Sequence, residues 1–173
     1  MITNTKLMEM LVGYSGSHQH PINIAFHLIG IPVIMFGIFI PLSWVSFNIL
    51  GISITLSHLT VIGFFLFYLT LDTLFALVFL VIGIIIAQFS LVIGLQPTSG
   101  NIALIAFLGG YVLQFVGHAI EKTIPVLIRH PIQAHLAAPF FVIVEIFGLL
   151  HLREELFLKV NKIVTERRKN EAL

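Results

Sequence analysis

Two long stretches of the chain carry no charged side chain. No Asp, Glu, Lys or Arg occurs between Glu9 and Asp72, a run of 62 residues, or between Asp72 and Glu121, a run of 48 residues. A membrane-spanning helix needs about 20 consecutive apolar residues, so each run can hold two such helices and a turn. The pattern predicts an all-α bundle with four membrane-spanning helices, near 24–42, 51–70, 74–95 and 102–118.

Short polar segments separate the predicted helices. The breaks at 41–48 (PLSWVSFN) and 96–101 (QPTSGN) are rich in residues that favour turns, and the third break contains Asp72. We expect the Asp72 carboxylate to cap the helix that follows it. The first apolar run is long and begins only after two charged residues, which is not the pattern of a secretory signal peptide.

The last third of the chain has a different character. A fifth apolar segment, 136–150, is short and contains Pro139 and Glu145, so a re-entrant or interfacial helix fits it as well as a span does. The charged tail, 151–173, predicts an amphipathic helix lying on the membrane or on the protein. Its apolar positions are Leu152, Leu156, Phe157, Val160 and Ile163. Because no linker is visible, we predict one membrane-embedded domain over 1–173.

Composition supports the membrane assignment and excludes several classes of protein. Apolar residues make up 58% of the chain and charged residues 10%, whereas soluble domains usually carry about 25% charged residues. The net charge of +1 is too small for binding along the phosphates of a nucleic acid. The chain has no cysteine, which excludes disulfides, thiolate-bound metals and a thiol nucleophile.

The basic residues predict an orientation. With four spans, the N-terminus, the Asp72 turn and everything after the fourth span share one side, and that side holds all nine Lys and Arg residues. The positive-inside rule places it in the cytoplasm. We therefore expect a multi-pass membrane protein, of the inner membrane in a bacterium or of the endoplasmic reticulum in a eukaryote. A spanning segment at 136–150 would carry the basic tail to the opposite side, which favours the non-spanning alternative.

Polar side chains gather at the cytoplasmic ends of the first and fourth predicted spans. His20, Asn23 and His27 share one helical face at the start of the first span. Gln114, His118 and Glu121 share a face at the end of the fourth. Polar groups at membrane depth are costly and usually face the bundle interior. The two faces are therefore expected to meet across a pocket.

Imidazoles and a carboxylate at one level suggest a site for a divalent metal. Imidazole suits iron, zinc, copper and nickel, and histidines with a carboxylate and open positions are typical of non-haem Fe(II) oxygenases. Asn23 and Gln114 could then orient the imidazole rings. The alternative is that these histidines are interfacial residues with hydrogen-bonded rings. Among the other histidines, His135 is a weaker candidate ligand and His18 a flexible neighbour of the first cluster.

Two motifs resemble those of a known family. Residues 14–32 and 114–125 match its two signatures, and Pro139-Phe140-Phe141 followed by Glu145 is similar to a third. The signatures read Tyr14 followed by His20-x-x-Asn23-x-x-x-His27-x-x-Gly30-x-Pro32, and Gln114-Phe-x-Gly117-His118-x-x-Glu121-Lys122-x-x-Pro125. The family is the membrane 2-hydroxy fatty acid dioxygenases, whose fungal members degrade the 2-hydroxy acid derived from phytosphingosine. The resemblance covers roughly residues 10–150.

The resemblance implies a reaction. A 2-hydroxy fatty acid and O2 would give the fatty acid one carbon shorter and CO2, with Fe(II) as cofactor and the substrate as the source of electrons. Its hydroxyl and carboxylate oxygens could chelate the iron, and its tail would lie among the spans in the bilayer.

The resemblance also implies residue roles. The expected ligands are His20, His27 and His118, with Glu121 as a fourth ligand or as a hydrogen-bond acceptor behind them. Asn23 and Gln114 would position ligands or the substrate carboxylate. Lys122 or Arg129 would attract that carboxylate at the cytoplasmic surface.

Three other functions remain open at this point. The first is a haem-binding electron carrier with His27 and His118 as axial ligands. The second is a transporter or structural membrane protein whose His and Glu side chains relay protons or pair with one another. The third is a zinc hydrolase that uses the same ligands, because sequence alone does not choose the metal. The oligomeric state is equally open.

Overall fold

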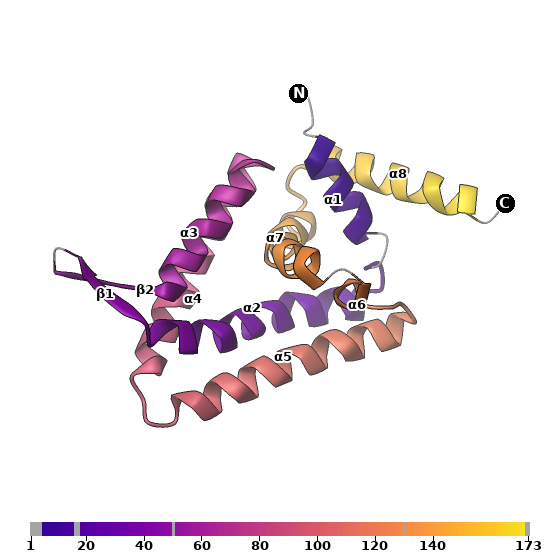
Figure 1. The fold of residues 1–173 in the computed structure, drawn as a ribbon. Coiled ribbons are helices and arrows are strands. Elements are labelled where there is room, and N and C mark those ends of the chain that lie inside the picture. Colours follow the sequence, from indigo (N-terminus) through magenta and orange to yellow (C-terminus); the bar gives the residue numbers. More distant parts are fainter. Residues whose placement is uncertain (1–4, 16–17, 50, 130, 172–173) are drawn as a thin grey trace.

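Two long helices packed side by side form the base of the molecule (Figure 1). The computed structural model describes residues 5–15, 18–49, 51–129 and 131–171. Helix α2 (Pro21–Ser43) and helix α5 (Ser99–Glu121) run antiparallel. Glycines allow their close approach: a Cβ added to Gly37 would lie 2.6 Å from the backbone nitrogen of Phe107, and one added to Gly110 would lie 2.8 Å from the carbonyl oxygen of Gly30. Small residues at a helix interface are a common device for packing inside membranes.

A second antiparallel pair consists of α3 (Leu56–Leu69) and α4 (Thr73–Gly94). The sequence predicts one helix over 51–70, and this boundary differs in the structure. The first residues of that range belong to a hairpin of β1 (Ser46–Ile49) and β2 (Ile52–Thr55), which turns at Gly51 with a φ of 81°. The β-branched residues of β2 favour strand, and α3 begins only after Thr55, whose backbone N–H donates to His58 Nδ1.

The helices long and apolar enough to cross a membrane are α2, α4, α5 and α7 (Pro131–Leu149). The number of such helices matches the prediction, and their identity differs in one case. Helix α3 has 14 residues, about 21 Å at 1.5 Å per residue, against a hydrocarbon core of about 30 Å. Large apolar side chains exposed on the helices, such as Leu66, Phe89 and Ile105, fit a lipid-facing surface. These features fit a multi-pass membrane protein.

Helix α7 crosses between the two helix pairs and is seen nearly end-on in Figure 1, whereas α2 and α5 are seen from the side. Near its start, the carbonyl oxygen of Leu136 accepts a hydrogen bond of 2.8 Å from the Tyr68 hydroxyl. Just past its end, Arg153 binds Asp72. Tyr68 and Asp72 flank the α3–α4 turn, so this turn contacts both α7 and the segment that follows it.

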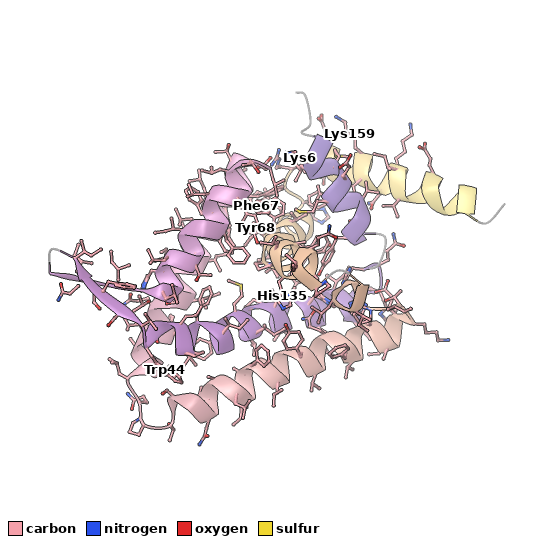
Figure 2. All side chains as sticks on the ribbon, viewed as in Figure 1. Lys6, Trp44, Phe67, Tyr68, His135 and Lys159 are labelled. Atoms are coloured by element: carbon pink, nitrogen blue, oxygen red, sulfur yellow. The ribbon has the colours of Figure 1, made fainter. Side chains whose placement is uncertain are left out.

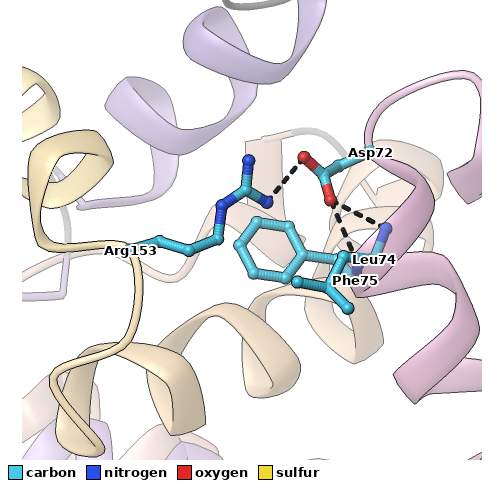
Figure 3. A network of polar contacts seen from close by, with 4 residues as sticks. All are labelled: Asp72, Leu74, Phe75 and Arg153. Atoms are coloured by element: carbon cyan, nitrogen blue, oxygen red, sulfur yellow. Dashed lines mark hydrogen bonds and ion pairs between the residues drawn. The ribbon is translucent and has the colours of Figure 1, made fainter.

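The Asp72 carboxylate joins two turns of the chain (Figure 3). Its Oδ1 accepts from the backbone N–H groups of Leu74 and Phe75, so the predicted capping of α4 is confirmed. Its Oδ2 accepts from the Arg153 guanidinium at 2.7 Å. That guanidinium also lies 4.7 Å above the centre of the Phe75 ring. The contact holds the segment that follows α7 against the start of α4.

The terminal helices pack on each other at one end of the molecule (Figures 1 and 2). Helix α1 (Thr5–Ser15) buries Leu7 and Leu11, and α8 (Glu154–Glu171) buries Leu156 and Val160 in the same apolar cluster. The amphipathic helix predicted for the tail is confirmed over Glu154–Glu171, and its apolar face rests on the protein. Leu152, predicted on that face, precedes the helix and is exposed. The remaining element, α6 (Val126–Arg129), is a single turn between α5 and α7.

Candidate metal centre

Three buried histidines from three separate segments converge where α2 begins and α5 ends. They are His18, which precedes α2, His27 in the second turn of α2, and His118 in the last turn of α5. Each offers one ring nitrogen, and these three atoms lie within 4.8 Å of one another. The ring centres lie 4.3 to 5.0 Å apart. This histidine triad has the donor set and the spacing of a site for a single divalent ion.

In each ring, Nδ1, which points away from the other two histidines, lies within hydrogen-bond distance of an oxygen atom. Nδ1 of His18 lies 3.0 Å from the Tyr14 carbonyl oxygen, and Nδ1 of His27 lies 2.9 Å from the Asn23 carbonyl oxygen. Nδ1 of His118 lies 2.9 Å from the Thr123 hydroxyl. A carbonyl oxygen only accepts hydrogen bonds, so His18 and His27 carry their proton on Nδ1. Hydrogen bonds of this kind orient metal-binding imidazoles in proteins and set their tautomer.

That tautomer leaves two lone pairs facing each other. Nε2 of His18 and Nε2 of His27 lie 3.0 Å apart, and with both protons on Nδ1 neither atom can donate to the other. A cation shared by both nitrogens relieves this repulsion. Two nitrogens bound at about 2.1 Å to one ion, at right angles, would also lie about 3 Å apart. The residues present therefore fit a bound metal.

Burial keeps the triad free of protons that would compete with a metal. All three side chains are less than a tenth exposed. Desolvation by burial, together with a smaller effect of the nearby His27, lowers the pKa of His18 to about 3. A histidine must be neutral to bind a metal ion, so His18 is ready to do so at any physiological pH.

The Glu121 side chain forms hydrogen bonds to the two segments that carry His18 and His27. Its Oε1 accepts from the backbone N–H of Gln19 at 2.8 Å, and its Oε2 accepts from the Asn23 side-chain amide at 2.5 Å. Gln19 follows His18 directly, and Asn23 holds the His27 ring. Asn23 is fully buried against Gly117, where an added Cβ would lie 2.3 Å from Asn23 Oδ1. Glu121 and Asn23 thus form hydrogen bonds that link the segments carrying His18, His27 and His118.

The other predicted residues lie outside the triad. His20 is the N-cap of α2, where its Nδ1 accepts from the Ile22 N–H at 3.3 Å. Gln114 donates to the Phe26 carbonyl oxygen at 3.4 Å and borders the cavity described below. Lys122 ends α5 in the left-handed conformation and is exposed. Arg129 belongs to α6, and its side chain lies outside the part of the structure that is described.

His18 is the ligand candidate that sequence reasoning did not select. The reasoning relied on helical periodicity, which pairs His20 with His27 on one face of α2. His18 precedes that helix, so no periodicity places its ring. The available signal was its distance of four residues from Tyr14, at the end of the preceding helix. The rings of Tyr14 and His18 stack with centres 3.8 Å apart.

An apolar cavity of about 200 Å³ opens from the triad into the bundle. The triad and Tyr14 line one end, and side chains of α2 line its length. Its other walls come from α3, α4, α5 and α7. The Tyr111 hydroxyl of α5 lies 2.7 Å from Nε2 of His135 of α7, and both residues line the cavity. His135 thus borders the cavity, and its Nδ1 lies 2.7 Å from the Pro131 carbonyl oxygen.

Replacing Glu121 by glutamine is expected to weaken metal binding about 10–100-fold, the usual effect of removing a hydrogen bond that orients a ligand. Both carboxylate oxygens accept hydrogen bonds, so one –NH2 group in their place would face another donor. A metal titration of the purified protein in detergent measures the effect. The exposed Glu155→Gln is the matched control. An affinity equal to that of the control would contradict the positioning role.

Comparison with known proteins agrees with the resemblance seen in the sequence. The family model described as 2-hydroxy-palmitic acid dioxygenase Mpo1-like matches residues 4–150. The chain is 28% identical over 141 residues to the 2-hydroxy-palmitic acid dioxygenase MPO1 of Saccharomyces cerevisiae, an alignment that covers 80% of this chain and 78% of the yeast protein. No solved structure matches the chain. Since the family model covers most of its length, the chain belongs to the Mpo1-like family.

Proposed function

We propose that the protein is an Fe(II)-dependent dioxygenase that shortens 2-hydroxy fatty acids by one carbon. In the balanced reaction, a 2-hydroxy acid and O2 give the next shorter fatty acid, CO2 and water. The main support for the proposal is that three buried imidazoles converge at the end of an apolar cavity. The family description and the name of the yeast relative support the same class of substrate.

The arrangement suits a substrate with a polar head and an apolar tail. His18, His27 and His118 would hold the iron, which when bound supplies the redox chemistry with O2. Three protein ligands leave positions for the hydroxyl and carboxylate oxygens of the substrate. The apolar cavity walls would receive the tail and exclude water from the metal. The substrate supplies the electrons, so the proposed reaction needs no organic cofactor.

The position of His18 favours iron alone over haem. A haem with two axial histidines has one imidazole on each face of the macrocycle, with the macrocycle plane between them. The ring of His18 lies beside both other rings, with its centre 4.3 Å from that of His27 and 4.8 Å from that of His118. A macrocycle between His27 and His118 would have to pass through that position.

We infer further that the metal centre lies on the cytoplasmic side. Lys6 and Lys159 lie at the opposite end of the molecule from Trp44 (Figure 2), and Lys122 ends α5 next to His118. Basic residues favour the cytoplasmic face, and tryptophan favours either membrane interface.

Anaerobic reconstitution with Fe(II) tests the function. The protein in detergent receives 2-hydroxypalmitate and then O2, and mass spectrometry follows the products, with His118→Ala as control. We expect pentadecanoate to form only with Fe(II) and to be lost in the variant. One bound iron per chain without product would overturn the substrate assignment. A chain that binds no metal would overturn the site itself and support the transport or structural alternatives.

A further inference from the structure

Side chains of the second helix pair form one wall of the apolar cavity. Thr60 and Phe64 of α3 and Phe79 of α4 line this wall, whereas His27 and His118 of the triad belong to the other helix pair. The rings of Phe64 and Phe79 are 6.0 Å apart, centre to centre. The metal centre and this wall therefore belong to different helix pairs. The distance from the triad to the wall depends on how α3 and α4 pack against α2.

The three residues of this wall are not equally constrained by their neighbours. Phe79 is 2% exposed, and its ring meets the ring of Tyr68 edge-on at 4.7 Å. Behind the wall, Val61 is fully buried and lies so close to Gly83 that a Cβ added there would be 2.8 Å from it. Phe64 is only partly buried. Truncating Phe64 removes its ring pair with Phe79 but leaves two buried contacts between α3 and α4 in place, Tyr68 with Phe79 and Val61 with Gly83.

The length of the cavity follows from the helix that lines it. Residues of α2 that border the cavity recur on one helical face, from His27 at the triad to Ile38. Eleven residues at 1.5 Å each give about 16 Å. An extended alkyl chain gains about 1.25 Å for every carbon–carbon bond, less than the 1.5 Å rise of a helical residue, so about 13 bonds fit this distance. A 2-hydroxy acid with its second carbon at the metal would reach the wall with about 15 carbons.

We propose that the wall of Thr60, Phe64 and Phe79 measures the acyl chain and sets which length of 2-hydroxy fatty acid the protein accepts. This inference rests on the proposed function, because it takes the occupant of the cavity to be the substrate's tail. Each methylene that gains or loses a place in the cavity changes affinity about fourfold, which corresponds to about 0.8 kcal/mol. A change of two methylenes at the wall therefore alters relative affinity by roughly tenfold or more.

Two substitutions at the wall are expected to shift the preference in opposite directions. Phe64→Ala removes a ring from this wall, so longer acids should gain about tenfold relative to the acid that the unmodified protein prefers. Thr60→Phe adds a ring, so shorter acids should gain by a similar factor. The Thr60 hydroxyl bonds only the Leu56 carbonyl oxygen of its own helix, so its loss breaks no contact between helices. Phe67→Ala is the control, since Phe67 lies on the same helix, is exposed and does not line the cavity.

The experiment uses straight-chain 2-hydroxy acids of twelve to twenty carbons and two measurements. The first is displacement of a fluorescent fatty acid from the metal-free protein, and the second is kcat/KM after loading with Fe(II). Opposite shifts in the two variants, with none in the control, would support the inference. An unchanged order of acids in both variants would overturn it, even where product forms. Shifted binding without product would uphold the length assignment and overturn the proposed reaction.

Discussion

His18→Ala is expected to abolish stoichiometric metal binding, whereas His20→Ser is expected to leave it intact. His18 contributes one of the three converging nitrogens, and His20 only caps α2. Losing a direct ligand should cost more than the roughly 10–100-fold that follows loss of an orienting hydrogen bond. Serine is among the preferred N-cap residues, so the His20 substitution should preserve the helix start. Metal content per chain and a metal titration measure both variants.

Folding must be separated from ligation in this comparison. The ring of His18 stacks on Tyr14, so its removal also leaves a gap beside α1. His18→Gln fills most of that gap without restoring the imidazole ligand, and thermal unfolding shows whether each variant keeps its structure. A folded His18→Ala or His18→Gln that retains full metal, together with loss of metal in His20→Ser, would return His20 to the ligand set. It would also mean that the loop before α2 is arranged differently from the structure described above.

Adjacent glycines in α5 are expected to respond to alanine in opposite ways. A Cβ at Gly110 would lie 2.8 Å from the Gly30 carbonyl oxygen and 3.0 Å from the Ile34 backbone nitrogen, whereas one at Gly109 would have no neighbour within 4 Å. Overpacking of this kind typically costs about 1–3 kcal/mol of stability. Alanine at Gly109 should instead be neutral or stabilise the helix by up to about 1 kcal/mol. Denaturation of the two variants in mixed detergent micelles measures both free energies of unfolding.

The same pair of variants also tests how the metal centre depends on helix packing. His27 lies on α2 and His118 on α5, so the nitrogen atoms separate when these two helices move apart. We therefore expect weaker metal binding in Gly110→Ala and unchanged binding in Gly109→Ala. Equal stability and equal metal affinity in the two variants would show that the close approach of α2 and α5 is not needed for the site.

Part of the fold and of the site can be predicted because it depends on local patterns. The uncharged runs on either side of Asp72 indicate an α-helical membrane bundle, since long apolar segments in lipid must satisfy their backbone hydrogen bonds internally. Asp72 as a cap follows from its position at a turn. His27 and His118 follow from polar side chains on otherwise apolar helix ends. Each of these inferences needs only the residues within a few helical turns of one another.

The structure differs from the sequence-based prediction where contacts between segments distant in the chain determine the local structure. The strand over Ile52–Thr55 shortens α3 and leaves the fourth long apolar helix to α7, although 51–70 is apolar enough to suggest a span. His18 and His20 are two residues apart but lie in different surroundings, because His18 stacks on Tyr14 of α1 whereas His20 caps α2. The amide that Glu121 holds belongs to a helix about 100 residues earlier in the chain.

The sequence by itself determined the class of protein, the helical architecture, the end of the bundle where polar groups gather and the family to which the chain belongs. These are set by composition, by hydrophobic periodicity and by short motifs, all of which are local properties. Only the tertiary structure decided that His18 joins the triad, that Glu121 and Asn23 stand behind it, and that aromatic rings of α3 and α4 line the cavity. Those contacts join segments far apart in the chain, and the glycines of α2 and α5 let these two helices meet closely enough to bring His27 and His118 together.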